Sequence, residues 1–182
     1  AVFFLARLLG NMYFINNIRH EGLILRCRRQ LISDAVPFLL FFLAFVIRTL
    51  LKDGFAVDAE TQTIVMEPYK YFNNLLAMPY LLILFLVGVI GVLFGLVKSI
   101  LSATYTKGIW FAGAGTVLTV LALLLCVGYN HTAYYPSTAD LQSSLTLANS
   151  CSSKFTLATM AYVSILVPFV LAYIVYAWRA ID

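Results

Sequence analysis

The sequence carries little formal charge. Only 11% of its 182 residues are Asp, Glu, Lys or Arg, whereas soluble domains contain about 25%. Apolar residues make up 62% of the chain. This composition excludes most classes of soluble enzyme and places the chain among membrane proteins. The net charge of +4 does not indicate nucleic-acid binding, because the basic residues lie between the apolar stretches.

Residues that ligate metals are also scarce. The two histidines, His20 and His131, fall in predicted loops, and the three cysteines form no CxxC, CxxCH or HExxH motif. Haem needs axial ligands such as His, Met or Cys at membrane depth, so we expect no haem, no metal and no catalytic residue in this chain. Whether Cys126 and Cys151 pair at the outer face stays open from the sequence.

Four apolar stretches are each long enough to cross a bilayer. The hydrocarbon core is about 30 Å thick, so a spanning helix needs about 20 mostly apolar residues. Residues 1–18 have the pattern of the end of a further helix, which suggests a fragment of a longer membrane protein. The predicted fold is therefore all-α, a single polytopic transmembrane helical bundle over residues 1–182 with up-down connections. The predicted full spans are residues 31–51, 71–97, 108–128 and 155–178.

The charges of the loops alternate along the chain. The first loop, the third loop and the C-terminus together hold seven basic residues, and the second and fourth loops hold three. Lys and Arg collect on the cytoplasmic side of membrane proteins. The C-terminus is therefore predicted to be cytoplasmic, and the loops over residues 52–70 and 129–154 should face the outside.

The most unusual charge is Arg7. It lies roughly 16 Å from the end of its predicted helix at 1.5 Å per residue, which places it near mid-membrane, and Asn11 follows one turn later on the same side. An ionisable group at this depth is a functional hypothesis by default. Arg7 and Asn11 are thus candidate buried polar or interface residues, and structural pairing within the bundle is the alternative. Asp34 is expected in the first turn of its helix.

Small residues and prolines interrupt the spans. Gly88, Gly91 and Gly95 lie on much the same face and include a GxxxG motif, which predicts close helix packing. Pro79 and Pro168 lie inside predicted spans and should kink them.

The last third of the chain contains a series of short motifs before and within its final span. They are Pro136-Ser137-Thr138, Ser144-Leu145-Thr146, Ser152-Ser153, Thr156-Leu157, Val167-Pro168 and the closing helix that ends at Trp178. Ser152 or Ser153 is a plausible N-cap of that span. Together these motifs resemble subunit II of cytochrome bd-type quinol oxidases. The sequence approaching the second full span, Tyr71-Phe72-Asn73-Asn74, fits the same family.

The resemblance implies a role as well as a fold. In that family, subunits I and II form a heterodimer in the bacterial inner membrane, and haem b, haem d and the quinol-oxidising site belong to subunit I. Subunit II has eight helices, and this chain would supply the end of the fourth helix and helices five to eight. The chain would then be a haem-free scaffold for a complex that oxidises quinol and reduces oxygen to water, with a quinone or lipid bound against its apolar faces. No catalytic residue can be transferred, because the acidic residues linked to proton or oxygen access lie in the other half.

Two other functions remain open. Half of a membrane transporter or channel could use Arg7 and proline-interrupted spans to line a path, although the sequence shows no internal repeat. The third hypothesis is a small membrane-embedded protein that binds a partner and catalyses no reaction.

Overall fold

The computed structural model describes residues 1–58, 61, 63–102 and 104–181, and most of these residues are helical. Four helices are long and apolar enough to cross a membrane, which agrees with the predicted all-α polytopic bundle. The helices are α1 (Val2–Asn17), α2 (Glu21–Leu51), α3 (Lys70–Ala77), α4 (Pro79–Leu101), α5 (Gly108–Gly128), α6 (Leu147–Ser150) and α7 (Lys154–Ile181).

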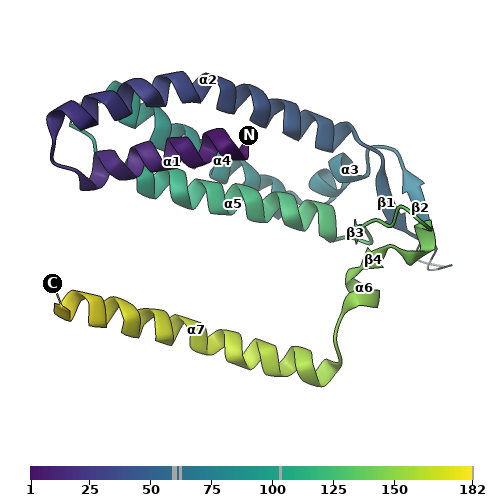
Figure 1. The fold of residues 1–182 in the computed structure, drawn as a ribbon. Coiled ribbons are helices and arrows are strands. Elements are labelled where there is room, and N and C mark those ends of the chain that lie inside the picture. The colour runs from purple at the N-terminus through teal and green to yellow at the C-terminus, as the bar shows by residue number, and fades with distance from the viewer. Residues whose placement is uncertain (59–60, 62, 103, 182) are drawn as a thin grey trace.

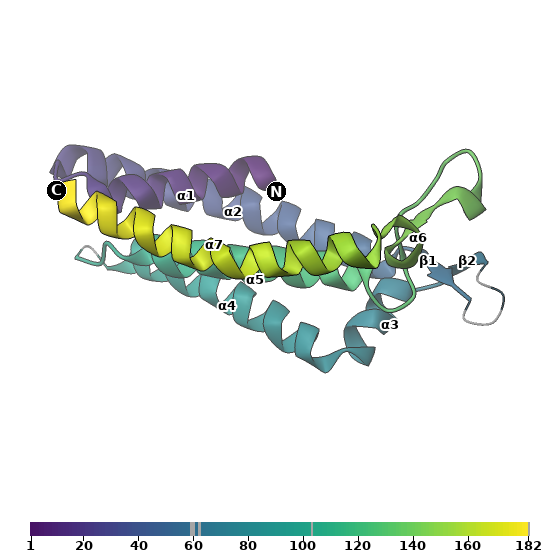
Figure 2. The same cartoon turned by 90° about the horizontal axis from the view of Figure 1, so that it is seen from below.

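The helices α1, α2, α4 and α5 lie side by side along one common direction (Figures 1 and 2). Their shared apolar core joins Leu8, Met12 and Ile15 of α1 to residues of α2, α4 and α5. Those three residues recur at helical spacing and therefore form one face of α1. The opposite face of α1 stays exposed.

The ends of this bundle differ. The α1–α2 turn, the start of α5 and the C-terminus point to the same end of the molecule, which we call the basic end (Figures 1 and 2). The helix ends there carry Arg26, Arg29, Lys98 and Lys107. At the other end, the hairpin end, the antiparallel strands β1 (Gly54–Val57) and β2 (Ile64–Glu67) form one sheet. A second small sheet there pairs β3 (Ala133–Tyr135) with β4 (Leu145–Thr146), and the short 3-10 helix η1 (Leu141–Ser143) precedes β4.

The helix bounds correct two sequence predictions. The arginine-rich segment expected to be a loop forms the first turns of α2, where the His20 side chain accepts a hydrogen bond from the backbone N–H of Leu23. Arginine is a good helix former, so charge alone does not end a helix. Asp34 consequently lies in the interior of α2, and its prediction as a first-turn residue was wrong.

The predicted span over residues 71–97 is divided into α3 and α4 at Met78. Pro79 is the first residue of α4, not an internal kink, because proline lacks the N–H that a helix interior needs and disfavours helical geometry at the preceding residue. The other predicted proline, Pro168, does lie inside a helix, α7. The third span, residues 108–128, is found with the predicted bounds.

The last helix, α7, stands apart from the other helices (Figure 1). None of its described residues is buried, although it is apolar on all sides. Its start is capped as expected, since the Ser153 hydroxyl accepts from the N–H of Thr156 at 3.3 Å. The predicted up-down connections therefore extend to α7, which runs back from the hairpin end, but α7 does not pack against the other helices (Figure 1).

Candidate intramembrane polar site

An ion pair joins α1 to α2 in the middle of the bundle. Arg7 Nη2 lies 3.2 Å from Asp34 Oδ1, and the Gln30 amide donates to the same oxygen at 3.2 Å. Asp34 lies about 20 Å from Glu21 and about 26 Å from Leu51 along α2, at 1.5 Å per residue. The pair therefore lies near the middle of α2, about 9 Å along the helix from Arg28.

The Asp34 carboxylate is enclosed by apolar side chains. Its side chain is 3% exposed, and Leu31, Ala35 and Phe38 of the same helix belong to the surrounding core. Both polar contacts fall on Oδ1, whereas Oδ2 has no hydrogen-bond partner among the described residues. A buried charge is costly unless it is paired, and Arg7 supplies the opposite charge beside Asp34.

Arg7, expected from the sequence to be buried, is only partly so. Its side chain is 41% exposed and lies over the ring of Phe3, with 5.7 Å between the guanidinium carbon and the ring centroid. Asn11 is partly buried one turn further on, and no hydrogen bond joins its side chain to any residue in the described part of the chain. The structure thus brings Arg7 to Asp34 and leaves Asn11 beside them.

The glycines predicted to mediate helix packing lie against α5. A Cβ atom on Gly88 would stand 2.9 Å from the carbonyl oxygen of Gly115, and one on Gly95 would stand 2.6 Å from that of Gly108. Gly91 lies against Gly115 as well. We call this contact the glycine seam, and backbone atoms of α4 and α5 approach each other along its whole length. The partner glycines on α5 were missed from the sequence, although the run Gly113-Ala114-Gly115 was a signal.

A buried arginine fastens α2 to the basic end of α4. Arg28 Nη1 donates to the carbonyl oxygens of Ser99, at 2.6 Å, and of Ser102, and Nη2 donates to that of Tyr105 at 3.2 Å. The last carbonyls of a helix have no partner within the helix. The guanidinium satisfies them and also adds a favourable positive charge at the negative end of the helix dipole.

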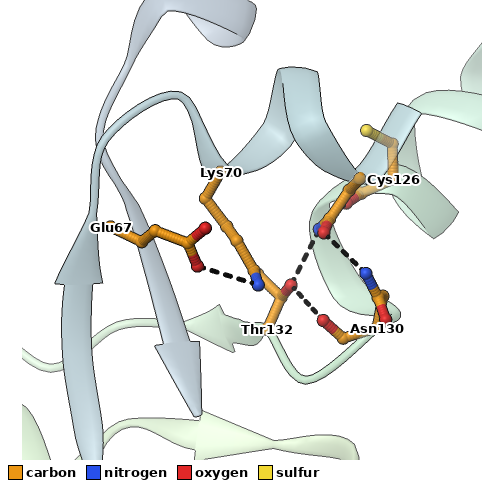
Figure 3. Close-up of polar contacts among 6 residues, drawn as sticks. Glu67, Lys70, Cys126, Asn130 and Thr132 are labelled. Carbon is orange, nitrogen blue, oxygen red and sulfur yellow. Dashed lines mark hydrogen bonds and ion pairs between the residues drawn. The ribbon is translucent and has the colours of Figure 1, made fainter. Parts of the chain in front are cut away.

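A second buried network lies at the hairpin end (Figure 3). The Asn74 amide donates to the Cys126 carbonyl at 3.1 Å and to the Thr132 hydroxyl at 2.8 Å, and its oxygen accepts from Asn130 at 3.0 Å. The Cys126 thiol donates to the carbonyl of Tyr71. This network joins α3, α5 and the segment between α5 and β3, so its role is to hold these elements together.

The same network bears on the cysteines. Cys126 is buried and Cys151 is exposed, and both are free thiols. The structure therefore shows no disulfide between these two residues, a question that the sequence left open.

An apolar cavity of about 380 Å³ opens between α1, α2, α4 and α5. Four phenylalanines of α2 line it on one side, namely Phe38, Phe41, Phe42 and Phe45. Thr116 and Thr119 line it on the other, but each hydroxyl already donates to a carbonyl of its own helix. The cavity thus suits a hydrocarbon chain better than a polar group.

The sequence was compared with models of protein families, and a family model matches almost the whole chain. The family described as cytochrome bd terminal oxidase subunit II matches residues 1–181. A search of curated proteins finds no match.

Proposed function

Because the chain belongs to the cytochrome bd terminal oxidase subunit II family, we propose that it is a haem-free membrane subunit supporting a haem-bearing partner. In the proposed complex, two quinols are oxidised and one oxygen molecule is reduced to two waters. The partner, subunit I, carries haem b, haem d and the quinol-oxidising site. This chain supplies a fixed set of helices against which the partner folds.

The placement of the histidines is the observation that carries this proposal. His20 lies at the start of α2, where its Nδ1 accepts from the N–H of Leu23, and His131 lies in the loop after α5. Neither histidine is inside a helix that could span a membrane. A haem within the membrane takes its axial ligands at membrane depth, most often from His, so this placement supports a haem-free subunit beside a partner that carries the electron transfer.

The packing of α4 and α5 supports a scaffold role. Along the glycine seam, backbone atoms of α4 and α5 contact each other directly and gain dispersion energy. A shift of one helix relative to the other would lose these contacts. Arg28 fixes α2 to the end of α4 and to the segment that follows it, through three carbonyl oxygens. We expect this unit to keep its shape while electrons move through the partner.

The apolar cavity supports binding of a lipid or quinone tail. Phenylalanines that line the cavity offer apolar contact. The threonines that line it already donate their hydroxyl hydrogens to backbone carbonyls, so few hydrogen-bonding groups are free for a ligand. We therefore assign it a structural hydrocarbon chain and not a reacting head group.

We also propose that the subunit lies in the bacterial plasma membrane with its C-terminus in the cytoplasm. The C-terminus lies at the basic end, together with Arg26, Arg29, Lys98 and Lys107 (Figure 2). Positive residues are retained on the cytoplasmic side.

One feature favours the alternative of a transporter or channel. The interruption at Met78 resembles the broken helices of transporters, whose binding sites lie near the midplane. However, α4 alone has 23 residues and can span the bilayer, and the break lies at the hairpin end beside the Asn74 network. The break is thus far from the Arg7–Asp34 pair, and we place this alternative second.

The test is a reduced-minus-oxidised absorbance spectrum of the complex purified through the full-length parent of this chain. The proposal expects haem b and haem d bands, oxygen uptake driven by quinol, and haem that stays with the partner when the subunits are separated. A folded complex without haem would refute it and favour the transporter.

A further inference from the structure

We propose that the outer face of α4 at the basic end binds a phospholipid whose head group carries a net negative charge. An acyl chain of this lipid lies along α4, and its head group lies near Lys98 and Lys107. The site is separate from the cavity between α1, α2, α4 and α5. It uses residues of this chain alone, so it does not rest on the proposed function.

The acyl chain has an apolar groove of about 490 Å³ on the surface of α4. From Ile90 to Leu101 this groove is about 16 Å long at 1.5 Å per residue. Half of a hydrocarbon core about 30 Å thick is about 15 Å, so the groove has the length of one leaflet. Its lining residues are Ile90, Leu93, Phe94, Val97, Lys98, Leu101 and Ser102.

The extent of the groove favours a lipid over another helix. Ile90 is the middle residue of α4 (Pro79–Leu101), so the groove occupies the half of α4 that is nearer the basic end. A lipid of one leaflet covers the same half of a membrane-spanning helix. The contacts of a second spanning helix would continue towards Pro79.

The position of Lys98 places the head group at the end of this groove. Its ammonium lies 5.9 Å from the centroid of the Phe94 ring, and that ring packs edge-on against Phe111 of α5 with centroids 5.1 Å apart. Lys98 is about 4.5 Å from the end of α4, which is about 34 Å long in total. A helix of this length reaches the head groups at both ends. Trp110, one turn into α5, is also exposed, and Trp is enriched at that level.

A second lysine lies at the same end of the α4–α5 pair. Lys107 is the N-cap of α5, and the next residue, Gly108, lies against Gly95 and Ser99 of α4. A helix N-terminus carries partial positive charge, which an anion stabilises and a cation does not. The first turn of α5 has no acidic residue, so Lys107 adds to a positive charge that the helix itself does not balance.

These charges decide which head group binds. In the part of the chain that the structure describes, neither Lys98 nor Lys107 forms an ion pair. A head group with net negative charge supplies the anion that both lysines lack. A zwitterionic head group would bring its own cation beside them and lose most of that attraction.

Photoactivatable lipids test the site in the full-length protein with any bound partner. Phosphatidylcholine vesicles contain equal small fractions of either phosphatidylglycerol or phosphatidylcholine that carries a diazirine on the same acyl chain. We expect phosphatidylglycerol to label the segment from Ile90 to Leu101 about fivefold or more above phosphatidylcholine, the ratio that corresponds to the attraction of one lysine to anionic lipid. Equal labelling by the two lipids would overturn the anionic head group. No labelling of this segment by either lipid would mean that protein covers the groove, and would overturn the site.

Charge variants test the position of the head group. Lys98→Gln combined with Lys107→Gln should abolish the preference for phosphatidylglycerol, and Lys98→Arg, which keeps the charge, should retain it. Lys52→Gln is the control, because it removes the same charge at the other end of α2, away from the basic end, and it should leave the labelling ratio unchanged. A preference that survives the double variant, or that Lys52→Gln lowers equally, contradicts the assignment.

Discussion

Replacing Gly115 by alanine should weaken the contact between α4 and α5 severely. The new Cβ would lie 2.5 Å from the carbonyl oxygen of Gly88 and 2.6 Å from the backbone nitrogen of Val92, whereas ordinary contact begins at 3.4 Å. The helices must therefore move apart by about 0.9 Å, because both obstructing atoms belong to backbone and cannot rotate away. A gap of about 0.5–1 Å removes a quarter to a half of each dispersion contact along the interface. We expect the free energy of unfolding to fall by about 3 kcal/mol, the upper end of typical overpacking costs.

Two other glycines provide matched controls for this variant. Gly113 lies on the same helix two residues earlier, and a Cβ there would meet nothing within 4 Å, so Gly113→Ala should be neutral or slightly stabilising. Gly91→Ala places its Cβ 3.3 Å from the Cα of Gly115, a contact that a small shift relieves. The expected order of destabilisation is Gly115→Ala, then Gly91→Ala, then Gly113→Ala.

The assay is unfolding of the protein in a neutral detergent, titrated with a denaturing detergent and followed by circular dichroism. The free energies of the three variants are compared with that of the unchanged protein. Equal losses for Gly113→Ala and Gly115→Ala would refute the argument from close backbone approach, since both changes add the same methyl group to the same helix.

Three further predictions concern the polar groups. Arg7→Leu leaves the Asp34 carboxylate buried without its partner and should lower the free energy of unfolding by about 3 kcal/mol. Addition of Asp34→Leu should recover most of that loss, and strictly additive losses in this double-mutant cycle would contradict the pairing. Arg28→Lys cannot reach the same three carbonyls with one ammonium group and should cost about 1.5–3 kcal/mol in the same titration, so an unchanged midpoint would refute the role of Arg28 in fastening α4. Cys151 should react rapidly with a maleimide in the native protein and Cys126 only after unfolding, as peptide mass spectrometry would show, and equal rates would contradict the burial of Cys126.

The sequence predicted best where the pattern is local. Residues 108–128 are free of charge and lie between charged or polar loops, so the bounds of α5 follow from length and hydropathy. The start of α2 was missed because arginine-rich residues are compatible with both a loop and a helix. The strands β1 and β2 have only four residues each, too few for a convincing alternation of apolar and polar residues.

The polar site depended on contacts that a single sequence does not reveal. Arg7 drew attention through its depth, but its partner lies on another helix and was expected at a helix start. Arg28 stands among other arginines of the same segment, and only the arrangement of the carbonyls at the end of α4 distinguishes it. The glycines of α4 predicted close helix packing from the sequence. The identity of the helix that they pack against, α5, became known only from the tertiary structure.

The distribution of specific contacts supports the scaffold role. At the basic end, Arg28 donates to three carbonyls, and at the hairpin end both N–H bonds of the Asn74 amide are used. Between these ends, the ion pair of Arg7 with Asp34 joins α1 to α2, and the glycine seam joins α4 to α5. Each of these contacts requires a particular geometry, because hydrogen bonds and close backbone approach are lost when the helices shift. A bundle held in this way keeps one shape and can offer a constant surface to another membrane protein.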